Sequence, residues 1–163
     1  PADGPAGAPA PHAGDEDEAF HEYQVNVLID NAEADGPPVI FETSPTFRNL
    51  FGSIDPVPEY GGIWRVDVSC IRPGSLHRAH GGYLVFNAFD ALSDPMVWPV
   101  LKRVLRYGQA DIQSQDHSAF MPGGGIKPDP MPCRVKVIML GDEALYETLA
   151  FDDESFKIGR AHV

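Results

Sequence analysis

Two nearly continuous apolar runs constrain the fold of this chain more than any other feature. Residues 82–88 read GYLVFNA and residues 133–140 read CRVKVIML. Strands that read as unbroken apolar runs are typical of parallel sheets, because helices cover both faces of such a sheet. Residues 94–108 lie between the two runs and have helical periodicity. The pattern therefore predicts an α/β fold with a mostly parallel sheet flanked by helices.

Three further segments carry strand signals upstream of the first run. Residues 23–29 (YQVNVLI) alternate apolar and polar side chains, and residues 39–42 and 63–71 are rich in apolar and β-branched residues. Alternation with a period of two is typical of a strand with one buried face. We therefore predict strands at all three positions.

Helix signals surround these strands. Ser44 and Pro45 predict an N-cap and a first helical residue, and Gly52 predicts the end of that helix. A second helix begins near Asp94, tolerates Pro99 only in its first turn, and ends at the predicted C-cap glycine, Gly108. Its predicted apolar stripe consists of Val97, Leu101, Val104 and Leu105. Residues 143–150 predict a third helix.

The composition divides the chain into segments. Residues 1–19 are Pro/Ala-rich and acidic, which predicts a disordered linker before a domain over residues 20–157. Residues 109–132 are Gly/Pro-rich and predict a long hairpin or loop insertion. Residues 158–163 (IGRAHV) fit no pattern and match what a common sequencing adaptor encodes in one frame, so we interpret them as an artefact. A frayed native tail is the alternative.

Charge and cysteine content exclude some classes of partner. The formal net charge is −12 and the first basic residue is Arg48, which makes a nucleic-acid partner improbable because phosphates require basic groups. The sequence contains no run of 18 apolar residues, so we predict no membrane span. The isolated thiols Cys70 and Cys133 fit a reducing compartment, so we predict a cytoplasmic protein, although a disulfide between them is not excluded by sequence.

A block at residues 72–92, RPGSLHRAHGGYLVFNAFDAL, resembles the AAA+ ATPase region of Lon-type ATP-dependent proteases, in the archaeal-like or membrane-type branch. Four more blocks have the order and spacing of that family. They read YQVNVLID, PVIFETSPTFRNLFGSI, WPVLKRVLR and PCRVKVIMLGDEALY. The resemblance implies a partial AAA+ P-loop NTPase fold that covers about four-fifths of the chain.

The same resemblance implies a parent protein that binds ATP and Mg²⁺, forms a hexameric ring and threads unfolded proteins to a Ser-Lys protease site. The sequence contains no G-x-x-x-x-G-K-[ST] phosphate-binding motif. We expect that motif upstream and the protease domain downstream, so we predict an incomplete domain without catalytic residues of its own and with no tight cofactor binding.

The resemblance places residues 87–90 at the end of the Walker B strand. Asn87 occupies the position of the metal-associated Asp, and Ala88 occupies a position where Glu is common. An amide cannot supply the negative charge that Mg²⁺ requires, so we predict weak hydrolysis unless another acid, such as Asp90, substitutes. The alternative function is a degenerate AAA+ scaffold for assembly and substrate handling. A small binding protein without ATPase ancestry is a third possibility.

Other candidate residues have two interpretations each. Asp142 follows the second apolar run, where it is a sensor for the γ-phosphate, a helix N-cap, or both. Arg78 either contacts a neighbouring subunit or holds local backbone or an acid. His77 and His80 form an H-x-x-H pair, but no third ligand lies nearby, so we predict no metal site.

Two aromatic residues beside glycines are candidates for a substrate-gripping pore loop. Tyr60 precedes Gly61 and Gly62, and Phe51 precedes Gly52. Phe51 is also a candidate core residue, which makes Tyr60 the better prediction for an exposed contact with substrate.

Overall fold

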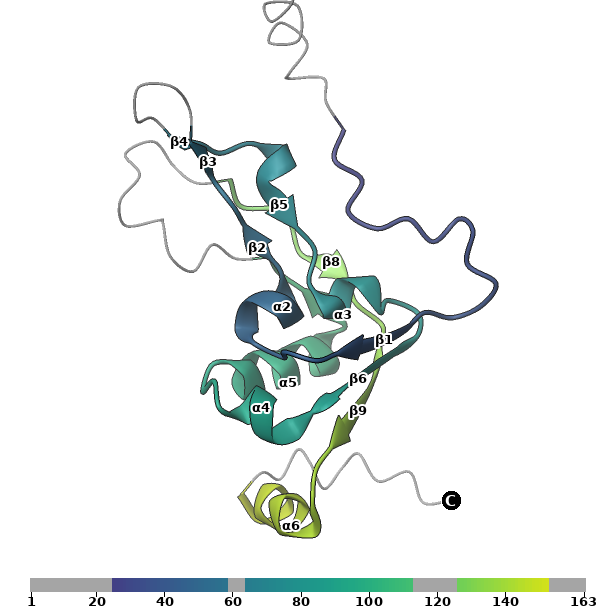
Figure 1. Cartoon of the computed structure of the whole chain (residues 1–163), viewed down its shortest axis with the longest axis vertical. Helices are drawn as coiled ribbons and strands as arrows, with labels where there is room; N and C mark the ends of the chain where they lie inside the picture. The colour runs from purple at the N-terminus through teal and green to yellow at the C-terminus, as the bar shows by residue number, and fades with distance from the viewer. Residues whose placement is uncertain (1–24, 59–63, 113–125, 153–163) are drawn as a thin grey trace, which may run out of the picture.

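The computed structural model describes residues 25–58, 64–112 and 126–152. Its centre is a three-stranded parallel sheet of β1 (Val39–Glu42), β6 (Tyr83–Asn87) and β9 (Lys136–Leu140), in the order β1-β6-β9 (Figure 1). The predicted α/β class with a parallel sheet is confirmed. The predicted boundaries at residues 19 and 157, and the proposed artefact at 158–163, fall at least partly outside the described residues and stay predictions.

The central strand is β6, as its apolar sequence requires. Leu84, Val85 and Phe86 are all buried, although they point alternately to the two faces of the sheet. In the parallel register, Leu84 pairs with Ile40 of β1 and with Val137 of β9. The prediction of a strand buried on both faces is confirmed here.

The prediction was wrong for the second apolar run. β9 begins at Lys136 rather than Cys133, and its residues alternate between exposed and half-buried, with Ile138 and Leu140 exposed. The reason is its position in the sheet, because β9 pairs only with β6 among the described residues.

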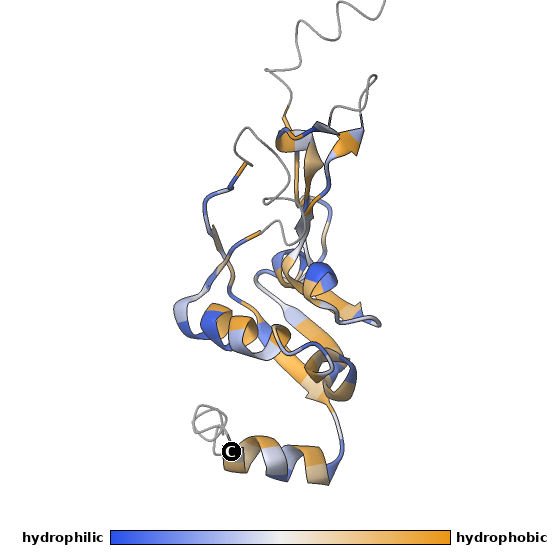
Figure 2. Ribbon diagram, turned by 90° about the vertical axis from the view of Figure 1, so that its left-hand side faces the viewer, coloured by the Kyte–Doolittle hydropathy of each residue, from blue (hydrophilic) through white to orange (hydrophobic). Residues whose placement is uncertain are grey.

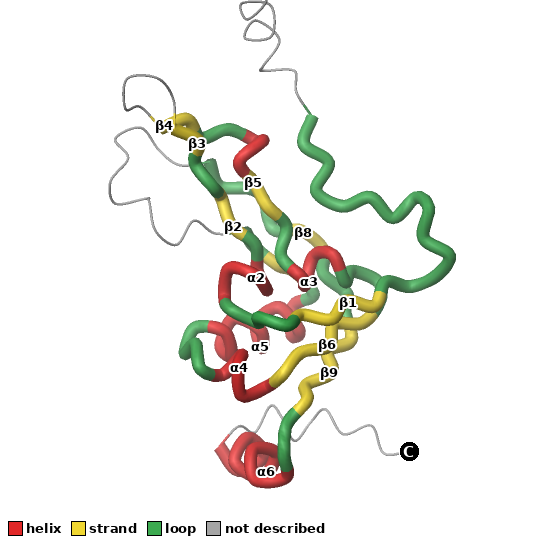
Figure 3. Tube along the Cα trace, in the orientation of Figure 1, coloured by secondary structure: helices red, strands yellow, loops and turns green. Residues whose placement is uncertain are grey.

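Helices cover one face of the sheet. They are α2 (Phe47–Phe51), α3 (Ser75–Arg78), α4 (Ala88–Leu92) and α5 (Val97–Tyr107). The last helix, α6 (Glu143–Asp152), does not cover this face and lies beyond the end of β9 (Figures 1 and 3). Phe47, Leu101 and Val104 pack with Leu84 and Phe86 in the main core. Figure 2 shows apolar residues along the strands and on the inward side of α5.

The α5 helix follows its predicted pattern with one exception. Pro99 is its third residue and lies in the first turn, and Gly108 caps its end with a left-handed φ of 66°. Leu105 is 45% exposed, so the apolar stripe is narrower than predicted. The preceding five-residue helix α4 carries too short a pattern for the sequence to predict.

The N-cap predicted for the first helix was wrong by two residues. Thr46, not Ser44, caps α2, because its Oγ1 accepts a hydrogen bond from the backbone N–H of Asn49 (3.3 Å). The helix end at Gly52 is confirmed, with a φ of 85° that favours glycine.

A second lobe consists of two-residue strands. β2 (Ser53–Ile54) pairs with β5 (Ile71–Arg72), β3 (Val57–Pro58) pairs with β4 (Trp64–Arg65), and η2 (Val68–Cys70) is a 3₁₀ helix between β4 and β5. The predicted strand over 63–71 was therefore wrong. Asp67 breaks it, since its carboxylate accepts the Ser69 N–H (2.8 Å) and caps η2.

Two other predictions concern the edges of this lobe. Residues 25–29 form no strand; instead, Asn26 donates from Nδ2 to the carbonyls of Val68 (2.7 Å) and Ile71 (3.1 Å). The hairpin predicted over 109–132 has an antiparallel base of β7 (Gln109–Ala110) and β8 (Met131–Pro132), and residues 113–125 lie outside the described part.

Cys70 and Cys133 are both buried free thiols, so the possible disulfide between them is not formed. Burial raises the pKa of the Cys133 thiol to about 11. Among the described residues, none of the helices combines the length and the apolar character that a bilayer crossing requires.

Candidate nucleotide site at the carboxyl ends of the strands

The parallel sheet brings the polar residues that follow its strands to one edge. Glu42 ends β1, Asn87 ends β6, and Asp142 follows β9 by two residues. Asn87 pairs in register with Leu140. In open α/β sheets, ligands bind outside the carboxyl ends of the strands, so this edge is the candidate site.

Asn87 is exposed and caps α4. Its Oδ1 accepts hydrogen bonds from the backbone N–H groups of Phe89 (2.9 Å) and Asp90 (3.4 Å). A carboxylate at the same position could accept the same bonds, because Asp and Asn are equally good N-caps. Substitution by Asp therefore adds a charge at this edge without removing the cap.

The two neighbours of Asn87 have different surroundings. Ala88 is 2% exposed, so it contributes packing and no chemistry. Asp90 is exposed in the first turn of α4, where its carboxylate faces solvent. Of these two residues, only Asp90 can offer negative charge to a ligand at this edge.

Asp142 caps the next helix. Its Oδ1 accepts a hydrogen bond from the backbone N–H of Leu145 (2.8 Å), and its carbonyl accepts the N–H of Tyr146 (3.1 Å). The N-cap interpretation is therefore confirmed, and a sensor role stays a prediction. Asn87 and Asp142 thus cap the two helices that leave adjacent strands at this edge.

Sequence reasoning missed Glu42, which organises the neighbouring strand end. Its Oε2 accepts the hydroxyl of the buried Ser75, its Oε1 accepts the N–H of Ser44 (3.0 Å), and Arg78 forms an ion pair with it (3.6 Å). The only sequence signal was an acid at the end of a strand.

Arg78 contacts an acid and a hydroxyl within its own chain, as one of its two interpretations required. Its Nη2 donates to the Ser75 hydroxyl (2.9 Å) and approaches Glu42, while its side chain is 50% exposed. These contacts support a role in holding an acid. A contact with a neighbouring subunit stays a prediction.

The H-x-x-H pair has structural roles in the described part of the chain. Nδ1 of the buried His77 accepts the N–H of Gly74 (3.3 Å), and Nδ1 of His80 accepts the N–H of Arg134 (3.2 Å). Burial lowers the pKa of His77, because it disfavours the charged imidazolium. No group of three metal-ligating side chains occurs among the described residues.

The two pore-loop candidates have separate outcomes. Phe51 is 1% exposed and its ring centroid lies 4.7 Å from that of Phe47, so it is a core residue. Tyr60 lies outside the described residues; the strands on either side of it, β3 and β4, form an antiparallel pair.

A parallel sheet with helices packed on it and helix caps at its carboxyl edge is typical of α/β proteins that bind ligands at this edge. Comparison with protein families sharpens this class. The family model described as "LonB-like, AAA domain" matches residues 35–159, and the chain belongs to this family. The Lon-type AAA+ resemblance is thereby confirmed, and an AAA domain implies nucleotide binding in general.

A curated relative agrees with this assignment over a shorter stretch. The "Putative Lon protease homolog" of Escherichia coli (strain K12) is 31% identical over 72 residues. That stretch is 44% of this chain and 12% of the relative. The chain therefore matches only a small part of that longer protein.

Proposed function

We propose that this chain is part of the ATPase and unfoldase module of a cytoplasmic Lon-type, ATP-dependent serine protease. The observation that carries the proposal is the pairing of the family match with the helix caps Asn87 and Asp142 at one sheet edge. ATP with Mg²⁺ would bind at that edge, in a parent protein that assembles as a hexameric ring and acts on unfolded proteins.

Each residue at the edge has a proposed role. Asn87 would stand at the metal-facing position, Asp90 would supply an exposed negative charge on α4, and Asp142 would lie where a sensor for the γ-phosphate is expected. Arg78 faces a neighbouring subunit with the exposed half of its side chain. Tyr60 grips substrate, so Tyr60→Ala in the parent should slow degradation of folded substrates.

The second candidate function is a scaffold that binds nucleotide and handles substrates without hydrolysis. The neutral Asn87 and the buried Ala88 favour it, because neither provides a carboxylate for the metal or for the attacking water. The two functions differ in ATP turnover and not in fold.

The deciding experiment restores the charge. Asn87→Asp in the full-length parent should raise the ATPase rate by about tenfold or more, because a carboxylate binds Mg²⁺ far better than an amide. Asn31→Asp makes the same change in the exposed segment before β1 and should leave the rate unchanged. Equal rates in all three proteins would remove Asn87 from the metal position.

A further inference from the structure

A polar cleft is lined by residues of α2, β2, β5 and α3, and by Glu42 at the end of β1. Its volume is about 430 Å³, and its lining includes three arginines and two acids: Arg48, Arg72, Arg78, Glu42 and Asp55. Three cations against two carboxylates leave one positive charge, in a chain whose formal net charge is −12.

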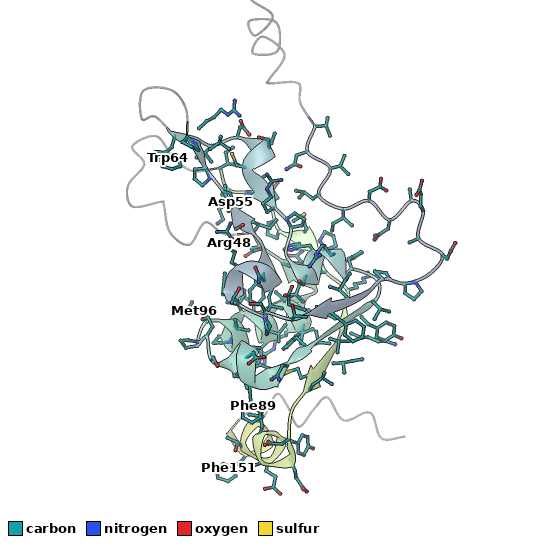
Figure 4. The ribbon with its side chains drawn as sticks, viewed as in Figure 1. Arg48, Asp55, Trp64, Phe89, Met96 and Phe151 are labelled. Atoms are coloured by element: carbon teal, nitrogen blue, oxygen red, sulfur yellow. The ribbon has the colours of Figure 1, made fainter. Side chains whose placement is uncertain are left out.

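The surplus charge belongs to Arg72. Arg48 forms an ion pair with Asp55 (2.7 Å), and the two side chains meet beside β2 (Figure 4). Arg78 forms its ion pair with Glu42 (3.6 Å). Arg72 is exposed and has no carboxylate partner within residues 25–58, 64–112 and 126–152.

The backbone fixes Arg72 relative to the end of α2. A Cβ on Gly52 would clash with the carbonyl oxygen of Arg72 and with the backbone N of Gly74, and a Cβ on Gly74 would clash with the carbonyl oxygen of Leu50. The two glycines therefore allow the end of α2 to contact the backbone that follows β5 directly. This contact fixes the backbone position of Arg72 beside the end of α2.

Further donors line the same cleft. Ser53 also lines the cleft, and the side chain of Arg48 is 65% exposed although it pairs with Asp55. Guanidinium and hydroxyl groups that line one cleft are the donor types that bind oxyanions.

We propose that this cleft is an oxyanion-binding site whose principal ligand-binding residue is Arg72. The bound group is a phosphate or a carboxylate, since both accept two parallel N–H bonds from a guanidinium. It comes either from a small phosphorylated molecule or from an acidic side chain of a second copy of this chain. Neither Asn87 nor Asp142 lines this cleft, although Glu42 at the end of β1 does.

The test measures binding of inorganic phosphate and of pyrophosphate to the full chain at low ionic strength, by isothermal titration calorimetry. Arg72→Gln should weaken binding by about tenfold or more, because a charge-assisted pair is lost, and Arg72→Lys should restore part of it. Arg106→Gln removes the same charge from the exposed side of α5 and should leave binding within about twofold. Far-UV circular dichroism verifies that each variant is folded.

Saturable binding that Arg72→Gln abolishes and Arg106→Gln retains supports the site. The source of the oxyanion follows from sedimentation velocity of the native chain with and without phosphate. Self-association that phosphate or Arg72→Gln reverses identifies an acidic side chain of another copy, and an unchanged sedimentation coefficient identifies a small molecule. No saturable binding, or equal loss in Arg72→Gln and Arg106→Gln, overturns the proposal, and neither result bears on the ATPase test.

Discussion

The main core and the second lobe are held together in different ways. The core cluster around Phe47, Leu84 and Leu101 joins α2, α5 and the parallel sheet through apolar side chains. The lobe has a much smaller apolar cluster around Ile54, Cys70 and Ile71, and its two-residue strands depend on hydrogen bonds such as those of Asn26. Stability resides in the first region, while the second depends on individual polar contacts.

The largest expected effect is a cavity in the main core. Leu84→Ala should lower the free energy of unfolding by roughly 2–5 kcal/mol, because Leu84 is 0% exposed at the centre of the sheet. Urea denaturation measures the change. Leu105→Ala on the 45% exposed side of α5 is the matched control and should cost well under half as much. Equal losses of unfolding free energy in the two variants would mean that Leu84 does not lie at the centre of the core.

Acidification should also act on the main core, through His77. Its pKa is lowered in the folded state by burial, so the unfolded state binds more protons and stability falls as pH drops below the unfolded value of about 6.5. The loss can reach about 1.4 kcal/mol per pH unit below that value.

Urea midpoints between pH 7.5 and 5 measure this dependence. His77→Gln should reduce the slope relative to the native chain, and His80→Gln should retain it. If His77→Gln loses stability with falling pH as steeply as the native chain, His77 is not a buried, neutral imidazole.

A smaller and more local effect is expected in the second lobe. Asn26→Ala removes the donors to Val68 and Ile71 and should cost about 1 kcal/mol. Hydrogen exchange should accelerate at η2 and β5 but not at β6. Asn31→Ala, in the exposed segment that precedes β1, is the control. Acceleration across both regions would show that the lobe and the core unfold together.

The smallest effect concerns the cap at the candidate site. Asn87→Ala should destabilise the fold by about 1 kcal/mol because the α4 N–H groups lose their acceptor, whereas Asn87→Asp should be nearly neutral. Thermal unfolding of the two variants separates the structural role of Asn87 from its proposed role at the metal. A loss of similar size in both would mean that the amide itself is required.

The same division explains what the sequence could predict. The strand over Leu84 to Phe86, the α5 helix and the Gly108 cap were predicted from local patterns and confirmed, except that Leu105 is exposed. The break at Asp67 depends on a short-range capping bond that competes with a strand pattern. Glu42 could not be identified as an organising residue, because its partner Ser75 lies 33 residues away in the sequence.

Within the candidate site, the sequence placed Asn87 at the end of its strand and Asp142 after its strand, since strand ends can be read from apolar runs. It could not decide between a sensor and a cap at Asp142, or between pore and core at Phe51. The core position of Phe51 depends on packing against strands and helices distant in the sequence. The cap at Asp142 is a local bond, and it leaves the sensor role open.

The most direct test of the central claim is hydrogen–deuterium exchange of the full-length parent with and without Mg²⁺ and a non-hydrolysable ATP analogue. We predict slower exchange at residues 87–92 and 141–146, where the capped helices begin, and no change at residues 64–72 of the second lobe. Protection confined to the second lobe, or none at either strand end under saturating nucleotide, would contradict a nucleotide site at the carboxyl edge of β6 and β9.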